Sequence, residues 1–276
     1  MCRVSIIIAA YNAERFITRA VTSIQNQTYQ DFEIIICDDS STDKTVEVVK
    51  NMMENDHRIR LLRNTENLKA AATRNKCINE AKGEYIAIQD ADDFSHKTRL
   101  EEQVYFLDNN NNYGFVSSKM FILSETDNIE ELSNFSPDSE GLLYKLSYIS
   151  SPDNKDFLYR LPYTHASTMF RKNVINDIGG YRVAKETVRG EDSDLFMRLH
   201  AKGNRGYNLN KALYYYLEGE DAYKRKKYRY RIHSAINRYK GFKAMGLLPR
   251  GYIFLLKPLI VGLIPLSLLR WYRNKH

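Results

Sequence analysis

Cysteine is scarce in this sequence of 276 residues, and its scarcity excludes a disulfide-stabilised scaffold. Only Cys2, Cys37 and Cys77 occur, and none of them has the C-x-x-C spacing of redox or zinc motifs. Such a small set is typical of a reducing compartment. We therefore expect a cytoplasmic protein whose thiols pack as small core residues.

Two phosphate-binding signatures are also absent. The sequence contains neither G-x-x-x-x-G-K nor G-x-G-x-x-G, which excludes a P-loop and a dinucleotide fingerprint. The six histidines lack the spacing of metal ligands, which argues against a zinc site.

The sequence has no uninterrupted apolar run long enough to span a bilayer, which takes about 20 residues. The longest candidate, 252–269, is broken by Lys257, Pro258 and Pro265. After Arg3 only a short apolar run precedes Tyr11, without a small-residue cleavage site, so no signal peptide is expected.

Acidic residues are missing from the last part of the chain. Residues 222–276 contain 14 Lys and Arg but no Asp or Glu, whereas residues 1–221 contain 27 basic and 34 acidic groups, a net charge of −7. A nucleic-acid-binding domain typically carries positive charge over its binding surface, whereas here residues 1–221 are acidic and only residues 222–276 are basic. We therefore expect no nucleic-acid partner. With 43% apolar and 27% charged residues, the chain is also not disordered as a whole.

The first hundred residues alternate between short apolar runs and amphipathic stretches. Apolar runs of strand length predict strands at 4–10, 32–37, 59–62 and 85–89, and helical spacing predicts helices at 16–24, 43–53, 68–81 and 97–108. Repeated units of this kind predict a parallel, doubly wound sheet with ligands at the carboxyl ends of the strands. Farther along, strands are expected at 114–123 and 166–170, and helices at 171–178 and 191–201.

Polar residues follow three of these strands directly, at Tyr11–Asn12, Asp38–Asp39 and Asp90–Asp93. Carboxylates two positions apart, as in Asp90 and Asp92, can hold a hard divalent cation. The alternative is a solvated turn that caps the next helix. A second aspartate pair at a neighbouring strand end favours a metal-assisted nucleotide site.

Other residues near these strand ends have two interpretations each. Asp39 either accepts a hydrogen bond from a base or ribose, or helps to cap a helix. Tyr11 either stacks on a base or lies at the edge of the core. Arg74 either pairs with a diphosphate or is an ordinary exposed arginine of a helix.

Three acids, Glu191, Asp192 and Asp194, begin the helix predicted at 191–201. They would interact favourably with the helix dipole, which is a sufficient structural reason for them. The functional alternative makes one of them a general base near the strand-end crevice.

The ordered set of motifs resembles the family 2 inverting glycosyltransferases, which have the GT-A fold. The matching segments are Val4–Asn12, Ser23–Thr28, Asp38–Asp43, Ala72–Asn75, Asp90–Asp93, Gly179–Tyr181 and Glu191–Leu195. The resemblance implies an α/β, Rossmann-like, mostly parallel sheet with helices on both faces. It covers residues 1–217, with a nucleotide-binding half at 1–108 and an acceptor-binding half at 109–217. Residues 218–276 would form a basic, helical, partly apolar extension.

The resemblance also implies roles for single residues. Tyr11 and the backbone at Ala9 would hold the base, Asp39 would accept from its N–H, and Arg74 would lie near the base or diphosphate. Asp90 would face the ribose and Asp92 the metal, Mg²⁺ or Mn²⁺, with Asp93 as a competing ligand. Asp192, beside Glu191, would be the base. Two departures are mild: Ala10 replaces the more usual Thr or Ser, and Ser40 stands where Gly is common.

The implied activity is the metal-dependent, inverting transfer of a sugar from a nucleoside-diphosphate sugar to a hydroxyl of a glycan acceptor. A UDP-sugar is the favoured donor. Family habit favours a lipid-linked acceptor and surface polysaccharide synthesis. One alternative is a glycosyltransferase that acts on proteins. Another is an inactive nucleotide-sugar-binding scaffold, although intact Asp92 and Asp192 argue against it.

The extension at 218–276 combines basic residues, aromatics and a broken apolar stretch, as in segments that lie in the headgroup layer of an anionic membrane. This predicts a peripheral protein on the inner face of the cell membrane. The alternative is a helical pair that packs on the catalytic domain or on a second subunit, as in a homodimer. Arg270–Trp271 is similar to a motif of processive synthases, but without its glutamine, so transfer of one sugar per acceptor is expected.

Overall fold

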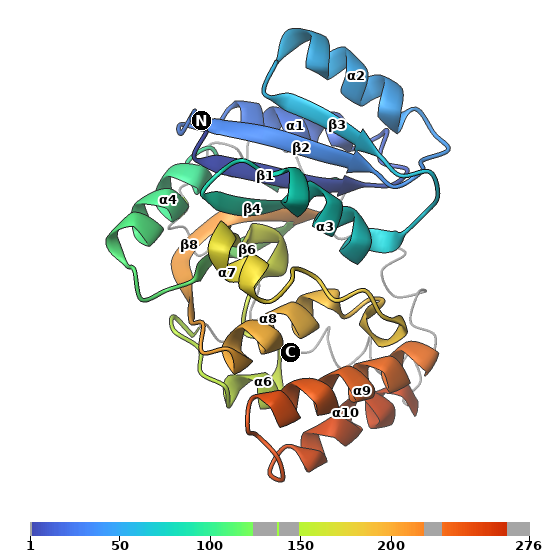
Figure 1. Cartoon of the computed structure of the whole chain (residues 1–276), viewed down its shortest axis with the longest axis vertical. Coiled ribbons are helices and arrows are strands. Elements are labelled where there is room, and N and C mark those ends of the chain that lie inside the picture. The colour runs from blue at the N-terminus through green and yellow to red at the C-terminus, as the bar shows by residue number, and fades with distance from the viewer. Residues whose placement is uncertain (1, 124–136, 138–148, 218–227, 264–276) are drawn as a thin grey trace.

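The computed structural model describes residues 2–123, 137, 149–217 and 228–263 (Figure 1). Its strands are β1 (Val4–Ala10), β2 (Phe32–Asp38), β3 (Ile59–Arg63), β4 (Tyr85–Asp90), β5 (Phe94–Ser95), β6 (Phe115–Leu123), β7 (Met169–Arg171) and β8 (Gly206–Leu217). Its helices are α1 (Ile17–Gln25), α2 (Thr45–Asn55), α3 (Lys69–Glu80), α4 (Arg99–Asn109), α6 (Asp156–Tyr159), α7 (Lys172–Asp177), α8 (Glu191–Ala201), α9 (Tyr228–Ala244) and α10 (Tyr252–Leu263), with short 3-10 helices η1 (His165–Ser167) and η2 (Lys185–Thr187).

The first four strands form the predicted parallel sheet, in the order β3-β2-β1-β4. The central strand β1 is buried along almost its whole length because helices cover both faces of the sheet. In this register Ala9 lies beside Asp90 of β4, and Ala10 lies beside Asp38 of β2. The carboxyl ends of β1, β2 and β4 therefore meet at one edge, as expected.

The second half of the sheet is mixed, which agrees with the mostly parallel sheet that the resemblance implies, whereas the parallel sheet predicted from the β-α units is found in the first half. Strand β7 runs antiparallel to both β4 and β6, β6 runs parallel to β8, and β5 runs antiparallel to β8. Parallel neighbouring strands need a crossover connection, usually a helix, whereas antiparallel neighbours do not. The alternation of strands and helices in the sequence therefore predicts only the parallel first half of the sheet. Strands β5 and β8 were not predicted.

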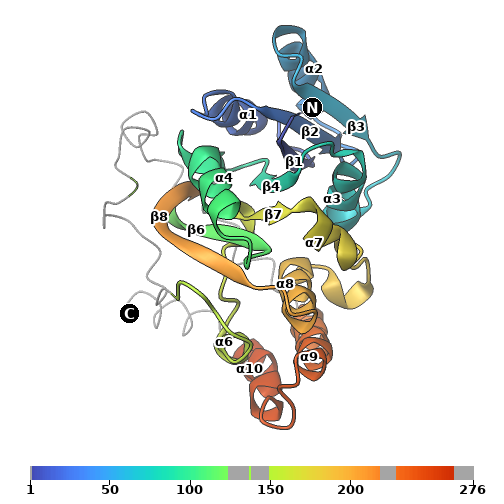
Figure 2. The ribbon, with the colours of Figure 1, turned by 60° about the vertical axis from the view of Figure 1, so that its left-hand side comes forward.

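Helices cover the sheet on both faces, as the sequence predicts. Figure 2 shows α1 and α4 on one side and α3 and α7 on the other. Buried side chains of α1, α2 and α4 pack with Ile6 and Ile8 of β1. On the opposite face, Ile7 packs with residues of α3, α7, α8 and α9. Cys37 and Cys77 are buried on that second face, as expected of core thiols.

The C-terminal helices α9 and α10 form a hairpin below α8, at the end of the molecule farthest from α2 (Figure 1). Phe242 of α9 is fully buried in the same cluster as Phe196 of α8. In the described part of the extension, a helical pair therefore packs on the catalytic domain, and this packing leaves the prediction of membrane binding untested. Arg270–Trp271 lies outside the described residues. No described helix is both long and apolar enough to span a membrane.

Candidate active site

The loops after β1 and β2 hold each other at the carboxyl edge of the sheet. The Asn12 backbone N–H donates to the Ser41 hydroxyl at 3.0 Å, and the Thr42 N–H donates to the Asn12 side-chain oxygen at 2.9 Å. Ser40, where the resemblance leads us to expect glycine, has φ +63°, a left-handed conformation that glycine adopts without steric cost. Tyr11 is 51% exposed beside these loops, so its ring is free to contact a ligand.

Asp39 is buried and fixes the start of α3. Its carboxylate accepts the Asn64 amide and the Leu68 backbone N–H, both at 2.8 Å, and the Lys69 N–H at 2.9 Å. Lys69 has φ +70°, so the chain turns sharply where this carboxylate holds it. A structural role at the start of a helix is therefore evident, and the role of Asp39 toward a base stays a prediction.

Arg74 is not the exposed helical arginine of the ordinary alternative. It is 8% exposed and bridges the two halves of the chain, 2.7 Å from the Asp90 carboxylate and 3.3 Å from that of Glu191. Burial acts to lower the pKa of Arg74, but the negative charge of Asp90, with Tyr181 and Glu191, raises it overall. Burial likewise acts to raise the pKa of Asp90, and the Arg74 charge lowers it overall.

The Gly179–Tyr181 motif places an aromatic ring beside Arg74. The Asn75 side chain accepts from the Tyr181 N–H at 2.8 Å and donates to the Tyr181 carbonyl at 2.7 Å. Gly180 has φ +67°, and a Cβ there would lie 2.5 Å from the Asn75 oxygen, so this position requires glycine. The Arg74 guanidinium then lies 5.7 Å from the centre of the Tyr181 ring.

The two candidate metal ligands, Asp92 and Asp93, are placed differently. Asp92 is exposed, and the pKa of its carboxyl is raised by the protein packed around the group and by the charge of Asp90. Asp93 is 1% exposed, and its carboxylate accepts the Leu217 N–H of β8 at 2.9 Å. The other Asp93 carboxylate oxygen is buried and has no hydrogen-bond partner within the described residues, so both Asp92 and Asp93 stay predicted metal ligands.

A buried network beneath Asp90 was not predicted. The Tyr214 hydroxyl of β8 accepts the Asp90 backbone N–H at 3.1 Å and the Gln89 amide at 3.2 Å. Arg99, fully buried, donates to the Ile88 carbonyl and lies 5.1 Å from the Tyr214 ring centre. These hydrogen bonds fix the carboxyl end of β4 from the interior of the protein. The only signal in the sequence is the polar Gln89 at the end of an apolar strand.

A preformed metal cluster is not found among the described residues, where no three His, Cys, Asp or Glu side chains converge. Mg²⁺ and similar ions commonly take one or two carboxylates together with substrate phosphates and water. Burial, with the charge of Asp90, raises the pKa of Asp92, and a divalent cation beside the two carboxylates would offset the repulsion between them. Asp92 with Asp90 therefore fits a cation that arrives with a diphosphate.

The three acids of the first turn of α8 have three different environments. Asp194 is buried between two arginines, 2.7 Å from Arg182 and 2.6 Å from Arg198. Glu191 pairs with Arg74. Asp192 forms no ion pair within the described part of the chain, and burial, with the charge of Glu191, raises its pKa to about 6 although the Arg74 charge acts to lower it. A carboxylate with this pKa can accept a proton near neutral pH.

A small pocket opens beside Glu191, the one of these three acids that lines it. Its volume is about 250 Å³, and it lies between the start of α3, at residues 68–71, and the segment 183–191. Much of its lining is apolar, including the exposed side chains of Leu68, Val183 and Val188. A substrate in this pocket would contact Glu191 directly.

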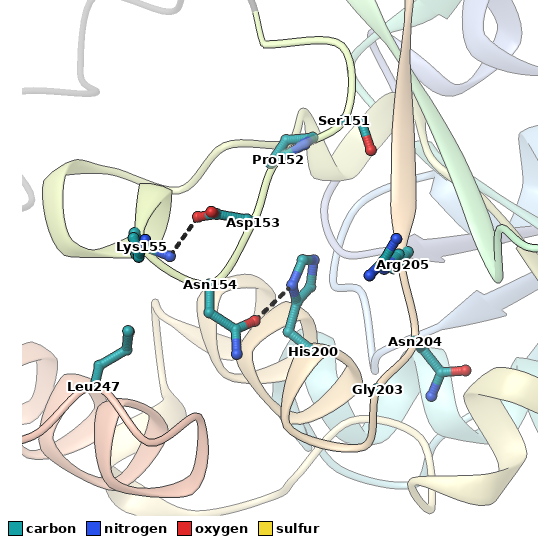
Figure 3. Close-up of a pocket in the computed structure, with 10 residues that line it drawn as sticks. All are labelled: Ser151, Pro152, Asp153, Asn154, Lys155, His200, Gly203, Asn204, Arg205 and Leu247. Atoms are coloured by element: carbon teal, nitrogen blue, oxygen red, sulfur yellow. Dashed lines mark hydrogen bonds between the residues drawn. The ribbon is translucent and has the colours of Figure 1, made fainter.

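A second, larger pocket of about 520 Å³ contains none of the predicted site residues (Figure 3). It lies at the other end of α8, where His200 binds Asn154 at 3.1 Å. The Tyr163 hydroxyl lies 2.9 Å from the other ring nitrogen of His200. Both ring nitrogens are thus occupied within the protein, and burial lowers the His200 pKa to about 4. This histidine has a structural role.

Comparison with known proteins identifies the family of the chain. The sequence model of Glycosyl transferase family 2 matches residues 5–183. EpsE of Bacillus subtilis strain 168, which carries a provisional glycosyltransferase name, is 36% identical over 275 residues, covering 99% of this chain and 94% of EpsE. WfaP of Escherichia coli, named UDP-Glc:alpha-D-GlcNAc-diphosphoundecaprenol beta-1,3-glucosyltransferase, is 45% identical over 105 residues, covering 38% of this chain and 41% of WfaP.

The fold has solved relatives as well. The crystal structure of S. aureus TarS 1-349 with UDP-GlcNAc matches 96% of this chain and 77% of its own, with a TM-score of 0.69 and 21% identity. At that identity the match establishes the fold alone, which is GT-A. Because the family's sequence model covers most of the chain, and EpsE is similar over nearly all of it, the chain belongs to glycosyl transferase family 2 and is a glycosyltransferase.

Proposed function

We propose that this protein transfers a sugar from a UDP-sugar to a hydroxyl of a lipid-linked glycan, with inversion and with help from a divalent cation. The observation that carries the proposal is Asp192, a carboxylate that forms no ion pair in the described structure and whose pKa is raised to about 6, beside Glu191, which pairs with Arg74. UDP as donor is supported by the names of WfaP and of the TarS complex, and the lipid-linked acceptor by that of WfaP. A structure of a Pyrobaculum calidifontis mannosyltransferase with GDP-Man and Mn²⁺, with a TM-score of 0.58, supports the cation.

The proposed reaction is a single displacement. Asp192 accepts the proton of the acceptor hydroxyl, whose oxygen forms a bond to the anomeric carbon while the bond to the diphosphate breaks. Attack from the opposite face inverts the anomeric centre and releases the nucleoside diphosphate. Glu191 holds Arg74, and its charge adds to the effect of burial that raises the pKa of Asp192.

The donor would lie along the carboxyl edge of the sheet. We assign the base to the backbone at Ala9, the Tyr11 ring and Asp39, and the ribose and diphosphate to Asp90 and Arg74. Asp92 would hold Mg²⁺ or Mn²⁺, which when bound neutralises charge on the departing diphosphate. This assignment uses the nucleotide-binding half, residues 1–108, whereas residues 109–217 would bind the acceptor.

Calorimetric titration with UDP, GDP, CDP and dTDP, each with and without Mn²⁺, tests the donor site. We expect Mn²⁺-dependent binding of UDP, weakened at least about tenfold by Asp92→Ala, because the cation loses its protein ligand. Glu54→Ala, which removes an exposed carboxylate on α2, should bind UDP as the wild type does.

Each other outcome contradicts a part of the proposal. Preference for another nucleotide contradicts UDP, and equal binding without Mn²⁺ contradicts the cation. Failure of the folded protein to bind any nucleotide contradicts the donor site, and UDP binding without transfer of a sugar favours the inactive nucleotide-sugar-binding scaffold. Transfer to a peptide but not to a diphosphate-linked glycolipid favours the protein-directed alternative.

The hairpin of α9 and α10 supports a peripheral membrane location. Exposed apolar side chains form a stripe on α9, at Tyr228, Ile232, Ile236 and Tyr239, and another on α10, at Ile253, Leu256 and Ile260. We call these seven residues the apolar stripe. The hairpin has seven Lys and Arg and no acid between residues 228 and 263, so it complements an anionic lipid surface. The inner face of the cell membrane is therefore the proposed location.

Sedimentation with vesicles tests this surface. We expect the full chain to bind phosphatidylglycerol vesicles, and Ile253→Ser with Leu256→Ser to weaken binding about tenfold or more, since an apolar side chain that enters the bilayer contributes about 1.5–3 kcal/mol. Tyr105→Ser removes an equally exposed aromatic from α4 and should bind as the wild type does.

If the double variant binds the vesicles as well as Tyr105→Ser does, the apolar stripe has no role at the membrane. If the wild type binds uncharged vesicles as well as phosphatidylglycerol vesicles, charge has no role. Sedimentation velocity without lipid completes the test. A dimer that the double variant dissociates would favour a second subunit as the partner of this face.

A further inference from the structure

One side chain of α9 is bonded to the start of the helix that carries Asp192. Asn237 is 2% exposed, and its amide donates to the Gly190 carbonyl at 3.0 Å. Its side-chain oxygen accepts from Arg182 at 3.2 Å. Gly190 immediately precedes α8, and its carbonyl also accepts the Asp194 N–H at 3.0 Å. Both lone pairs of this carbonyl are therefore used, one by α8 and one by α9.

The segment that leads into α8 needs this support. Arg189 has φ +66°, a left-handed conformation that costs an L-residue about 1 kcal/mol or more. Such a conformation persists only where surrounding contacts impose it. A second contact comes from the next turn of α9, where Lys240 pairs with Glu186, which also pairs with Arg182.

Helices α8 and α9 pack closely against each other around Gly241. A Cβ on Gly241 of α9 would lie 2.2 Å from the sulfur of Met197 in α8. Phe242 is fully buried beside them. In Figure 1 α9 runs directly below α8. The position of α9 therefore fixes the amide of Asn237 relative to the first turn of α8.

We propose that Asn237 is a positioning residue for the catalytic turn, so that the C-terminal hairpin completes the active site in addition to any contact with a membrane. The inference depends on the proposed function, in which Asp192 is the base. The Asp192 carboxylate accepts the N–H of its neighbour Ser193 at 2.6 Å, so its direction follows the backbone of the first turn. Asn237 sets that backbone through Gly190.

Two variants of Asn237 test the proposal in the full chain. Asn237→Ala removes both hydrogen bonds, whereas Asn237→Asp keeps the volume and an acceptor for Arg182 but places a carboxylate against the Gly190 carbonyl. We expect kcat with UDP-sugar and a soluble acceptor analogue to fall about 10- to 100-fold in both, the cost of misplacing a reacting group by about 1 Å. UDP affinity, measured by calorimetry, should be unchanged.

The pH profile separates positioning from simple destabilisation. Burial is the largest cause of the raised pKa of Asp192, so a loosened turn should move the acid limb of kcat/KM from pH about 6 toward lower pH. Ser234→Ala, a polar-to-alanine change one turn earlier on α9, should keep the wild-type kcat and acid limb.

If both Asn237 variants keep the wild-type kcat per UDP-binding site and the wild-type acid limb, the proposal is wrong, whatever their melting temperatures. The parallel variant Asp192→Asn keeps the two hypotheses apart. If it is inactive while the Asn237 variants are normal, only the positioning role fails. If it is active, the base assignment fails and this inference with it.

Discussion

Replacing Asp192 with asparagine should lower kcat by about 10²- to 10⁴-fold, the usual contribution of a general base. The change keeps the shape of the side chain and removes only its capacity to accept a proton from the acceptor. UDP binding in the presence of Mn²⁺ should stay within about twofold of the wild type, because the donor is assigned to the strand ends. Single-turnover kinetics and calorimetry measure the two quantities separately.

Asp177→Asn is the matched control, since Asp177 is exposed at the end of α7 and has no assigned role. It should transfer sugar at the wild-type rate. Equal loss of transfer and of UDP binding in Asp192→Asn would contradict the assignment of the base, and so would unchanged transfer.

The acid limb of the wild-type pH profile offers an independent measure of the same group. With a pKa of about 6 in the free enzyme, Asp192 is protonated below that pH, so kcat/KM should fall about tenfold per pH unit there. The folded-state pKa lies above the ordinary value of 3.8, so the ionised group lowers stability once the pH rises through about 6. Asp192→Asn should therefore melt at the same temperature as the wild type, or higher, at pH 7.

The sequence predicts the first half of the fold well because local patterns determine it. The buried run Val4–Ala10 and the polar residues behind three strands place β1, β2 and β4 correctly and bring Ala9, Asp38 and Asp90 to one edge. The second half depends on pairing between distant segments, such as β6 with β8, and β8 carries no simple alternation of polar and apolar residues. Long-range pairing of that kind is not encoded in local periodicity.

The features of the site that the sequence does not predict also depend on contacts between distant segments. Three acids in one helical turn are equivalent in a sequence, and only tertiary contacts separate Asp194, which pairs with two arginines, from Asp192. The ordinary interpretation of Arg74 fails because its partner Glu191 lies 117 positions away. Asn237 carries no motif at all, and its place against Gly190 follows from how α9 packs on α8.

Replacing Arg74 with methionine should cost both stability and donor binding. Methionine fills a similar volume but leaves the Asp90 and Glu191 carboxylates without their common cation in a largely buried place. Removing one partner of a buried ion pair typically costs about 3–5 kcal/mol, and the partial exposure of these carboxylates reduces this to about 2 kcal/mol or more. Urea denaturation at pH 7 measures the stability loss, and calorimetry with UDP and Mn²⁺ should detect at least about tenfold weaker binding, because a diphosphate loses its arginine.

The pH dependence of that stability loss identifies its cause. Arg74 lowers the pKa of Asp90 below its ordinary value of 3.8, so the stabilisation is present above that value and disappears as the pH falls through the lowered one. The stability difference between wild type and Arg74→Met should therefore be largest near pH 7 and shrink below pH about 4. Arg205→Met, which removes an exposed arginine that lines the other pocket, should show no such trend.

Arg74→Lys separates charge from geometry. Lysine keeps the positive charge but has a single ammonium in place of the guanidinium fork that reaches Asp90 and Glu191 at the same time. Its stability should lie between those of the wild type and Arg74→Met. If Arg74→Lys matches the wild type in both stability and UDP binding, a positive charge alone is sufficient, and the bridge between the two halves of the chain is not what the arginine provides. A difference between wild type and Arg74→Met that does not change between pH 7 and pH 4 would instead assign the loss to packing around Tyr181.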